Sequence, residues 1–547
     1  MMDQFQFDFP NFMSRRQFFT WMAGLGGGIL LGNLLPACRS KETEQASQAQ
    51  PGEVRKLVIA TAVDLYTIDP AIGFDTAIAS TLKGLYDALF RHVGNPPRTI
   101  PWLVDRYETS KDARVWTFKL FENITFHDGT PLTAEAVAYS AERLLKIDKG
   151  PASLFSGILK PGSMKAINRY TVRMTLIRPF GAFLDTLPWL FIVNPGLVSA
   201  HAGQDHGQTW LKDHEAGSGP FTIAEWKPGE KYVFQAKSDY WKGWPDKTHH
   251  LLRYERRVIK EGADRVKALE THEADLADWI LPGEQKRLEE KGFLILKEPS
   301  IETYEIKMNN KVGYTANIHV RKAIAYAFDY EALLQLWEGR AVLADGPLPP
   351  GLGCARKDLN MYQQNMEKAQ AELARSPWPQ GSFSLDYVYV AGLEEERKTG
   401  EIIRDQLARL KIKVHLIPMA WADAVNSFKN PKTAPALFPL YSSTAYADPD
   451  NYFWSGYHSS QAGEWTNPGH YASKAMDRLL EKARTILNAK ERKKFYCLAQ
   501  KKAIEDAGTL FGISALDHHV FGKRIRDLAY CPVTGSDEDF YFLSLSE

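Results

Sequence analysis

A histidine, an aspartate and a glycine stand side by side at His127, Asp128 and Gly129, within the stretch ITFHDGTPLTAEAV. A histidine beside a carboxylate is typical of proton transfer in an active site. Asp-Gly is also a turn pair, because glycine adopts positive φ at little cost and aspartate caps its own turn. Thr133 then stands at the position of a helix N-cap, with Glu135 in the first turn. The pattern predicts strand, turn and capped helix, in which His127 makes a structural contact with the neighbouring aspartate.

Two further motifs fail on spacing. Ser218 would need glycines at positions 216 and 220 to form a nucleophile elbow, but Ala216 and Pro220 occupy them. The string DPDNYF, residues 448–453, resembles the start of a calcium loop, but its sixth position is Phe453 instead of glycine. Neither a serine nucleophile nor a calcium loop is therefore expected.

Histidines and cysteines give no metal motif. The two adjacent histidine pairs lie at 249–250 and 518–519, and neighbouring residues of a strand point to opposite faces. No C-x-x-C pair occurs among Cys38, Cys354, Cys497 and Cys531. We expect no bound metal and no cofactor. With Cys38 set aside the cysteine count is odd, so we expect no essential disulfide framework, and a single pair remains an open alternative.

The N-terminus has the layout of an export signal. Arg15 and Arg16 precede the glycine-rich apolar run 21–35, which is shorter than the roughly 20 apolar residues of a membrane span. The consecutive arginines resemble the twin-arginine type, and the run ends in LPAC, which resembles a lipobox with Cys38 as the lipidated residue. Residues 39–53 are polar and predict a flexible linker. We expect residues 1–38 to be a lipoprotein signal peptide and lipid to hold the chain at the periplasmic or extracellular face of the cell membrane.

The remaining composition is that of a globular protein with several domains. The chain has 547 residues, of which 44% are hydrophobic and 24% charged, with a formal net charge of +1. This balance lacks the basic excess that nucleic-acid binding needs. We therefore expect no nucleic-acid partner.

Local periodicity predicts several elements. Residues 115–121 alternate as a half-buried strand, and residues 221–236 form a hairpin around the turn KPGE. Apolar residues at helical spacing predict helices at 78–89 and at 320–336. The run 382–418 is expected to be a strand, a helix at 394–410 and a second strand, which is the βαβ pattern of a parallel α/β sheet.

An ordered set of strings resembles family 5 of the solute-binding proteins, the dipeptide-, oligopeptide- and nickel-binding components of ABC importers. FHDGTPLTAEAV at 126–137 is the most recognisable of them. The others are TIDPA at 67–71, LYDAL at 85–89, GSGPF at 217–221, DYWKG at 239–243, VRKAIAYAFD at 320–329, DPDNYFW at 448–454 and AMDRLLEKA at 475–483. The resemblance covers essentially the whole chain after the signal.

This resemblance implies an α/β, two-lobed periplasmic-binding-protein fold with mixed sheets, hinged lobes and an extra inserted subdomain. Lobe I would comprise 54–300, with the inserted subdomain at about 79–215, and lobe II 301–516. Residues 517–547 would return to lobe I. The family's mechanism is binding without catalysis: a peptide-like or other small polar ligand is enclosed between the lobes and delivered to an ABC permease in the membrane. A monomer is expected.

In peptide binders of the family, an aspartate shortly before the DP motif pairs with the ligand's free α-amino group. Here Ala445 occupies that position, three residues before Asp448, so the resemblance implies that the amine anchor is missing. Asp448 is expected to keep a structural role, and the alternative is a shifted alignment in which Asp448 is the amine anchor. The residues expected to line the ligand cleft are Tyr66, Trp421, Tyr441, Ser443, Thr444, Ala445, Tyr446 and Trp454.

Two other functional classes remain as alternatives. One is a ligand-sensing or chaperone-like receptor that kept the fold and lost transport. The other is an exported hydrolase, which the failed serine motif, the absent zinc motifs and the lack of a recognisable carboxylate pair disfavour.

Overall fold

The structure is a computed structural model that describes residues 55–352, 359, 361–533 and 538–546. Cys38, Arg15, Arg16, the signal at 1–38 and the linker at 39–53 lie outside these residues, as does Cys354. Within the described ranges, Cys497 is disulfide-bonded, in agreement with the alternative of a single bridged pair. Cys531 is buried. None of the described helices combines the length and apolar character needed to cross a membrane.

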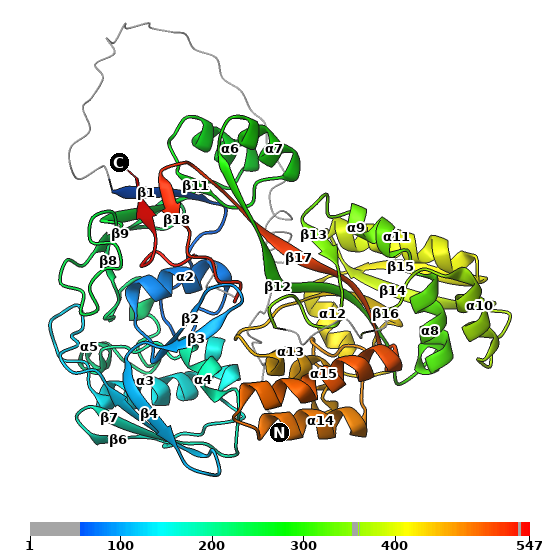
Figure 1. Ribbon diagram of the computed structural model, residues 1–547, viewed down its shortest axis with the longest axis horizontal. Helices are drawn as coiled ribbons and strands as arrows, with labels where there is room; N and C mark the ends of the chain where they lie inside the picture. Colours follow the sequence, from blue (N-terminus) through cyan, green and yellow to red (C-terminus); the bar gives the residue numbers. More distant parts are fainter. Residues whose placement is uncertain (1–54, 353–358, 360, 534–537, 547) are drawn as a thin grey trace, which may run out of the picture.

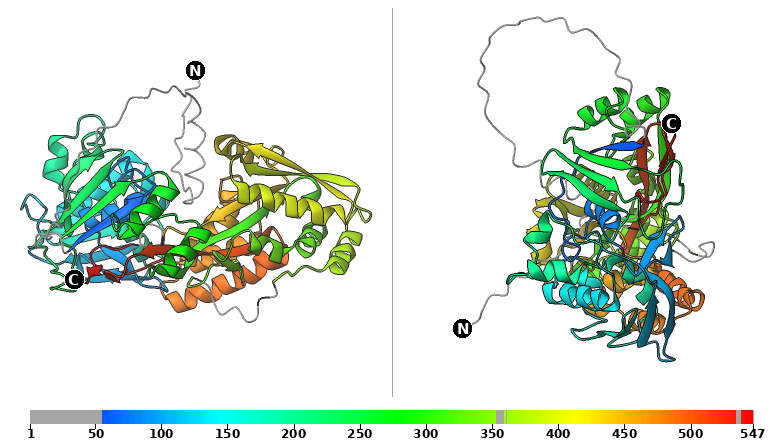
Figure 2. Two further views of the ribbon diagram at one scale, coloured as in Figure 1. Left: turned by 90° about the horizontal axis from the view of Figure 1, so that it is seen from above. Right: turned by 90° about the vertical axis from the view of Figure 1, so that its left-hand side faces the viewer.

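Two bodies lie side by side, and two long antiparallel strands run through both (Figures 1 and 2). These strands are β12 (Leu294–Met308) and β17 (Thr509–Phe521), and they are central to one mixed sheet of eleven strands. The sheet has the order β15 (Ile412–Met419), β14 (Phe383–Val390), β16 (Leu437–Ser442), β12, β17, β11 (Leu276–Ala277), β1 (Lys56–Thr61), β10 (Arg253–Val258), β9 (Lys231–Ala236) and β8 (Phe221–Lys227), with β13 (Ala341–Leu343) also on β17.

The pairing of β12 with β17 is interrupted in the middle. Residues 294–299 of β12 pair with residues 516–521 of β17, and this end of β17 also pairs with β11. After a register shift between Pro299 and Thr303, residues 303–307 pair with 509–514, with a second shift between Tyr304 and Glu305. Residues 303–308 also pair with β16. Each half of the strand pair therefore belongs to a different body, which we call lobe I (β1 side) and lobe II (β14 side). The domain boundaries stated above stay predictions.

Lobe I carries a second sheet at the end remote from the β12–β17 crossing (Figure 1). Its order is β4 (Val104–Thr109), β5 (Val115–Leu120), β7 (Thr171–Thr175) and β6 (Met164–Asn168), and α3 (Ala134–Ile147) packs on it. In β5 the side chains of Trp116, Phe118 and Leu120 are buried and their neighbours are half-buried, which confirms the predicted alternation.

Lobe II contains the predicted βαβ unit. Strands β14 and β15 are parallel and in register along their whole lengths, and α11 (Glu394–Ala408) connects them. The buried face of this helix contains Glu396, Thr399, Gly400, Ile403 and Leu407. The hairpin β8–β9 is also confirmed.

The two predicted helices at 320–336 and 78–89 are shorter in the structure. The first is divided into α8 (Ile318–Ala327) and α9 (Tyr330–Gln335), because Phe328 is extended and the side chain of Asp329 accepts the N–H of Ala332 as a new N-cap. The second is α2 (Thr76–Leu85), and Leu89 lies beyond its end. The apolar spacing continues past the ends of α8 and α2, but the helical backbone stops there.

The remaining elements complete the two lobes (Figure 1). They are β2 (Phe90–Val93), β3 (Arg98–Pro101), α4 (Phe183–Thr186), α5 (Pro195–Ala200), α6 (Gly262–Glu270), α7 (Pro282–Glu290), α10 (Met366–Ala374), α12 (Trp421–Phe428), α13 (Pro449–Tyr457), α14 (Lys474–Arg484), α15 (Ala489–Asp506), β18 (Ile525–Asp527) and β19 (Ser544–Leu545).

Candidate ligand-binding site

Three of the recognised strings meet at one buried carboxylate in lobe I. Asp87, from LYDAL, accepts the hydroxyl of Ser218 at 3.0 Å and that of Tyr240 at 2.7 Å. It also accepts the indole N–H groups of Trp102 at 2.8 Å and Trp241 at 3.0 Å. Four donors saturate a carboxylate that burial would otherwise penalise. GSGPF and DYWKG thus hold the lobe I core together, and the Ser218 hydroxyl is used there as a structural donor.

His127 makes a structural contact, but its predicted partner was wrong. Its Nδ1 lies 2.7 Å from the carboxylate of Glu215, and its Nε2 lies 2.9 Å from the carbonyl oxygen of Gly219. Asp128 instead accepts hydrogen bonds from Thr130 and Asn194, because the turn directs its side chain away from the imidazole. Helix α3 begins directly after Thr133, as predicted, although the threonine side chain makes no capping hydrogen bond.

The segment 443–446, expected to line the cleft, lies at a contact between the lobes. Ala445 is 1% exposed, its N–H donates to Asn451 Oδ1 at 2.9 Å, and its carbonyl accepts the indole N–H of Trp189 at 2.5 Å. Thr444 and Tyr446 are also buried, and Ser443 is exposed. No carboxylate is present at position 445 to receive a ligand amine.

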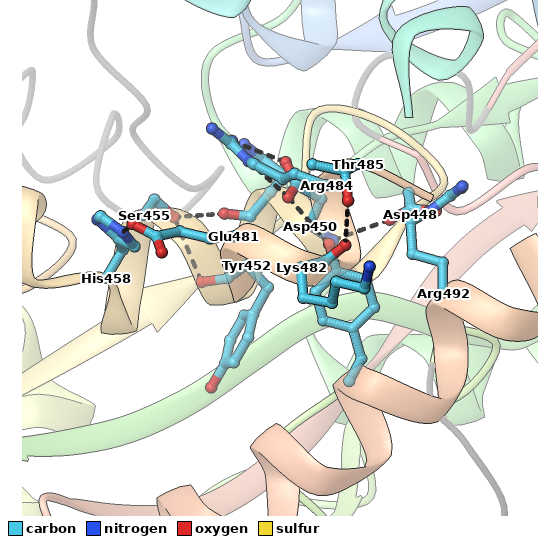
Figure 3. A network of polar contacts seen from close by, with 12 residues as sticks. Asp448, Asp450, Tyr452, Ser455, His458, Glu481, Lys482, Arg484, Thr485 and Arg492 are labelled. Carbon is cyan, nitrogen blue, oxygen red and sulfur yellow. Dashed lines mark hydrogen bonds and ion pairs between the residues drawn. The ribbon is translucent and has the colours of Figure 1, made fainter. Parts of the chain in front are cut away.

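Each of the two aspartates of the DPD string forms an ion pair with an arginine (Figure 3). Asp448 caps α13 by accepting the N–H of Asp450 at 3.0 Å, and its other oxygen lies 2.5 Å from Arg492 Nη2. The carboxylate of Asp450 receives Arg484 through two bonds of 2.8 Å, and the hydroxyls of Tyr446 and Tyr496 at 2.8 and 2.9 Å.

All four carboxylate oxygens of the pair therefore have partners within the protein. Burial alone would raise the pKa of Asp450, but the charge of Arg484 and the hydrogen bonds outweigh it and lower the pKa. This geometry is that of a structural network.

The other expected cleft residues are dispersed. Tyr441 is buried in the lobe II core, its ring 4.8 Å from that of Tyr304. Trp421 is partly buried in a separate cluster beside Phe438. Tyr66 lies on lobe I with 47% of its surface exposed. The structure thus brings together 443–446 and Trp454, and places the other three elsewhere.

The Trp454 ring is covered on both faces. The guanidinium of Arg484 lies 3.4 Å from its centroid, and the His458 ring is stacked at 3.8 Å with an interplanar angle of 13°. Two planar groups at these distances fit only on opposite faces. A ligand could therefore reach the ring edge, while the flat surface that would stack on an aromatic ligand is already used.

A contact that sequence reasoning missed joins lobe I to α13–α15. The N–H of Gly181 donates to the carbonyl of Arg484 at 2.6 Å, and a Cβ at Gly181 would lie only 2.0 Å from the carbonyl oxygen of Ile486. Phe180 lies with its ring 5.1 Å from the Arg484 guanidinium. No short motif marks these residues, because the two sides are about 300 positions apart and each alone resembles ordinary core sequence.

Two carboxyls from the two lobes share Arg492 at this contact. Asp185 of α4 lies 3.9 Å from the guanidinium that holds Asp448, and Thr99 donates its hydroxyl to Asp185. Burial, with the negative charge of Asp448, raises the pKa of Asp185 to about 7. Burial and the neighbouring negative charge thus both favour the protonated form of Asp185 at this contact.

The described residues contain no group of three or more histidine, cysteine or acidic side chains placed to hold a metal ion. His518 Nδ1 donates a hydrogen bond to Gln285 Oε1 at 2.7 Å, and burial lowers the pKa of His518 to about 4. His249 contacts Asp246, and His250 stacks on Trp244.

Comparison with known proteins identifies the family. The model of the bacterial extracellular solute-binding proteins, family 5 Middle, matches residues 98–464. A probable D,D-dipeptide-binding periplasmic protein of Escherichia coli K12, DdpA, is 28% identical over 491 residues, covering 87% of this chain and 92% of the relative. Heme-binding protein A of Haemophilus influenzae is 24% identical over 494 residues, covering 85% and 89%.

Solved structures share the fold. HbpA2 of Haemophilus parasuis superposes with a TM-score of 0.80 at 24% identity, covering 90% of this chain and all of that one. The periplasmic binding protein DppA of Helicobacter pylori, in complex with the peptide STSA, gives 0.73 at 23% identity, covering 90% and 98%. The two lobes, the mixed sheet and the family match agree, and the chain belongs to family 5 of the bacterial extracellular solute-binding proteins.

Proposed function

We propose that this protein is the extracytoplasmic receptor of an ABC importer. It captures a peptide-like or other small polar ligand between its lobes and delivers it to the membrane permease. The observation that carries the proposal is the β12–β17 pair, which belongs to both lobes and loses its register between Pro299 and Thr303. A break in a strand pair that connects two bodies is suited to hinge bending, because few hydrogen bonds oppose it. The relatives, named for dipeptide and heme binding, support a binding role without catalysis.

Ligand recognition, in this proposal, does not depend on a free α-amino group. Ala445 offers no carboxylate, and those of Asp448 and Asp450 are engaged by Arg492 and Arg484. Tyr66, Trp421, Ser443 and Trp454 are the expected cleft residues with accessible surface, and the role of each stays a prediction. Tyr441, Thr444 and Tyr446 are buried, and their role in ligand binding stays a prediction.

The function is tested by ligand-induced stabilisation. At 100 times the dissociation constant a ligand stabilises the folded state by about 2.7 kcal/mol, which a thermal-shift screen detects. The screen should contain peptides, oligosaccharides and metal chelates, and a hit should also reduce the radius of gyration in X-ray scattering as the lobes close. A stabilising compound that leaves the scattering curve unchanged would contradict enclosure between lobes.

The missing amine anchor gives a sharper comparison. Each di- to pentapeptide should be measured beside its Nα-acetylated form, which differs only in losing the ammonium charge. We expect little stabilisation by the free peptides. The affinities for the two forms should agree within about threefold, because no carboxylate pairs with the ammonium group. A free peptide that binds ten times more tightly than its acetylated partner would show that another acid supplies the anchor.

Lipid anchoring at Cys38 is a separate part of the proposal, and the protein acts as a monomer in it. Cys38→Ala should move the protein from the membrane fraction to the soluble extracytoplasmic fraction, because the thiol that carries the lipid is gone. Ser40→Ala is the matched control and should remain membrane-bound. Retention of Cys38→Ala in washed membranes would overturn the lipobox interpretation.

A further inference from the structure

A basic hollow lies on the four-stranded sheet of lobe I. It has a volume of about 540 Å³ and is formed by β6, β7 and the segments that flank them. Four of its lining residues are cationic, namely Arg114, Lys160, Lys165 and Arg173, and none is acidic. All four are exposed to solvent.

The backbone register places like charges opposite one another. Lys165 of β6 pairs directly with Arg173 of β7, and like charges at opposed positions of an antiparallel pair are destabilising. Arg114 is held at the rim, since its Nε donates to the carbonyl of Leu176 at 3.3 Å. Among the described residues, Lys160, Lys165 and Arg173 have no ion-pair partner. The arrangement is unfavourable alone and becomes favourable when an anion occupies the hollow.

Two carboxylates flank the hollow, and Asp112 offsets part of the charge of Arg114. Asp112, close to Arg114, is exposed and hydrogen-bonded to Ser110. Glu142 of α3 accepts the N–H of Gly162 at 2.8 Å and pairs with Lys146 at 3.6 Å. Both lie outside the lining of the hollow.

Apolar side chains stand beside these charges. Ile177 lines the hollow with 47% of its surface exposed, and Ile167, at the end of β6, is 46% exposed. Exposed aliphatic side chains next to lysine and arginine fit the interface of an anionic bilayer, where phosphates meet the cations and the acyl boundary receives the apolar groups.

We propose that this hollow binds the phosphate-bearing headgroups of an anionic membrane surface. The inference rests on the proposed location of the protein at the membrane. Strand β1, where the described chain begins, lies at the other end of lobe I from β6 and β7 (Figure 1). The 16 residues 39–54 can span about 55 Å, and a lobe of this size is roughly 50 Å across. A segment of this length is therefore sufficient for the hollow to face the bilayer.

Vesicle flotation tests the proposal on the full chain carrying Cys38→Ala, which excludes lipidation. Vesicles of pure phosphatidylcholine report insertion of the apolar N-terminal run, and vesicles with 30% phosphatidylglycerol add the charge. We expect at least about tenfold tighter binding to the anionic vesicles at low salt, with a loss of the difference at 0.5 M salt. The pair Lys165→Glu with Arg173→Glu should abolish the difference.

Two controls distinguish an effect of these two positions from an effect of net charge or of misfolding. Reversing both residues keeps the cross-strand repulsion, so the melting temperature should stay that of the parent. Lys413→Glu with Lys432→Glu changes the net charge equally at exposed sites of lobe II and should retain anionic binding.

Equal binding by the lobe I variant and the parent would overturn the proposal, and so would equal loss in both variants. Inorganic phosphate that stabilises the parent without vesicle binding would overturn it in favour of a free anion. Since neither solute nor lipid anchor enters the assay, its failure is distinct from failure of the proposed function.

Discussion

Asp450→Asn is expected to lower the free energy of unfolding by about 3 to 5 kcal/mol, which is the typical effect of removing one partner from a buried ion pair. The carboxylate is 1% exposed and is the counter-charge of Arg484, which it holds through two bonds of 2.8 Å. An asparagine keeps the shape but presents an NH₂ group to a guanidinium and two tyrosine hydroxyls, all of which are donors there. Arg484, which is only slightly exposed, would lose its charge partner.

The consequences should spread beyond the helix that carries Asp450. Arg484 also stacks on Trp454, and its carbonyl accepts the N–H of Gly181 across the lobes. The substitution should therefore weaken ligand-induced closure as well as stability. Urea unfolding followed by tryptophan fluorescence measures the first effect, and X-ray scattering with ligand measures the second.

A double-mutant cycle isolates the pair. Arg484→Met alone should also destabilise, and the double variant should be less damaged than the sum of the single ones, because no buried charge is left without a partner. Asp423→Asn, at an exposed site in the first turn of α12, is the control. Additive effects, or a loss below about 1 kcal/mol for Asp450→Asn, would contradict the assignment of this carboxylate as a structural centre.

Local sequence patterns predicted those parts of the fold that local interactions determine. The alternation in β5 and the βαβ unit β14–α11–β15 follow from apolar residues at spacings of two and of three to four, and both are confirmed. The prediction of one continuous helix at 320–336 was wrong, because apolar spacing carries no information about a capping side chain. Asp329, followed by Glu331 in the next turn, was the available signal for a new helix start.

Contacts between distant residues could not be found in this way. The recognised strings identified the family, yet that Ser218, Tyr240 and Trp102 all meet at Asp87 follows only from the folded chain, since the first two lie 131 and 153 positions away. Likewise Ala445 was predicted to line a cleft, but its carbonyl is engaged by Trp189, 256 positions away. Burial and hydrogen bonding at such sites depend on which distant segments meet in the folded chain, and local periodicity carries no information about that.

Glu396→Gln is expected to stabilise the protein above neutral pH and to remove a pH dependence of its stability. Glu396 stands in the first turn of α11 and is fully buried in lobe II. One carboxyl oxygen accepts the N–H of Val390 at 2.8 Å, and the other has no hydrogen-bond partner among the described residues. Burial raises the pKa of this carboxyl to about 8, against an ordinary value of 4.5.

The sign follows from proton binding in the two states. Between pH 4.5 and about 8 the folded protein keeps the proton on Glu396 and the unfolded chain releases it. Stability from this group is complete below pH 4.5 and is lost as the pH rises to about 8, with a slope of about 1.4 kcal/mol per pH unit. Glutamine carries no charge at any pH and has the shape of the protonated acid, so its advantage should grow across this window to a few kcal/mol.

Unfolding free energies measured at pH 5, 6.5 and 8 distinguish this titration from a general effect of pH. The difference between Glu396→Gln and the parent should be small at pH 5 and increase at each step. Glu394→Gln changes an exposed residue of the same helix turn, whose pKa is lowered by Arg397, and its difference from the parent should stay nearly constant over this range. A constant difference for Glu396→Gln would mean that this carboxyl ionises in the folded state as it does in water, which requires water or a cation beside its second oxygen.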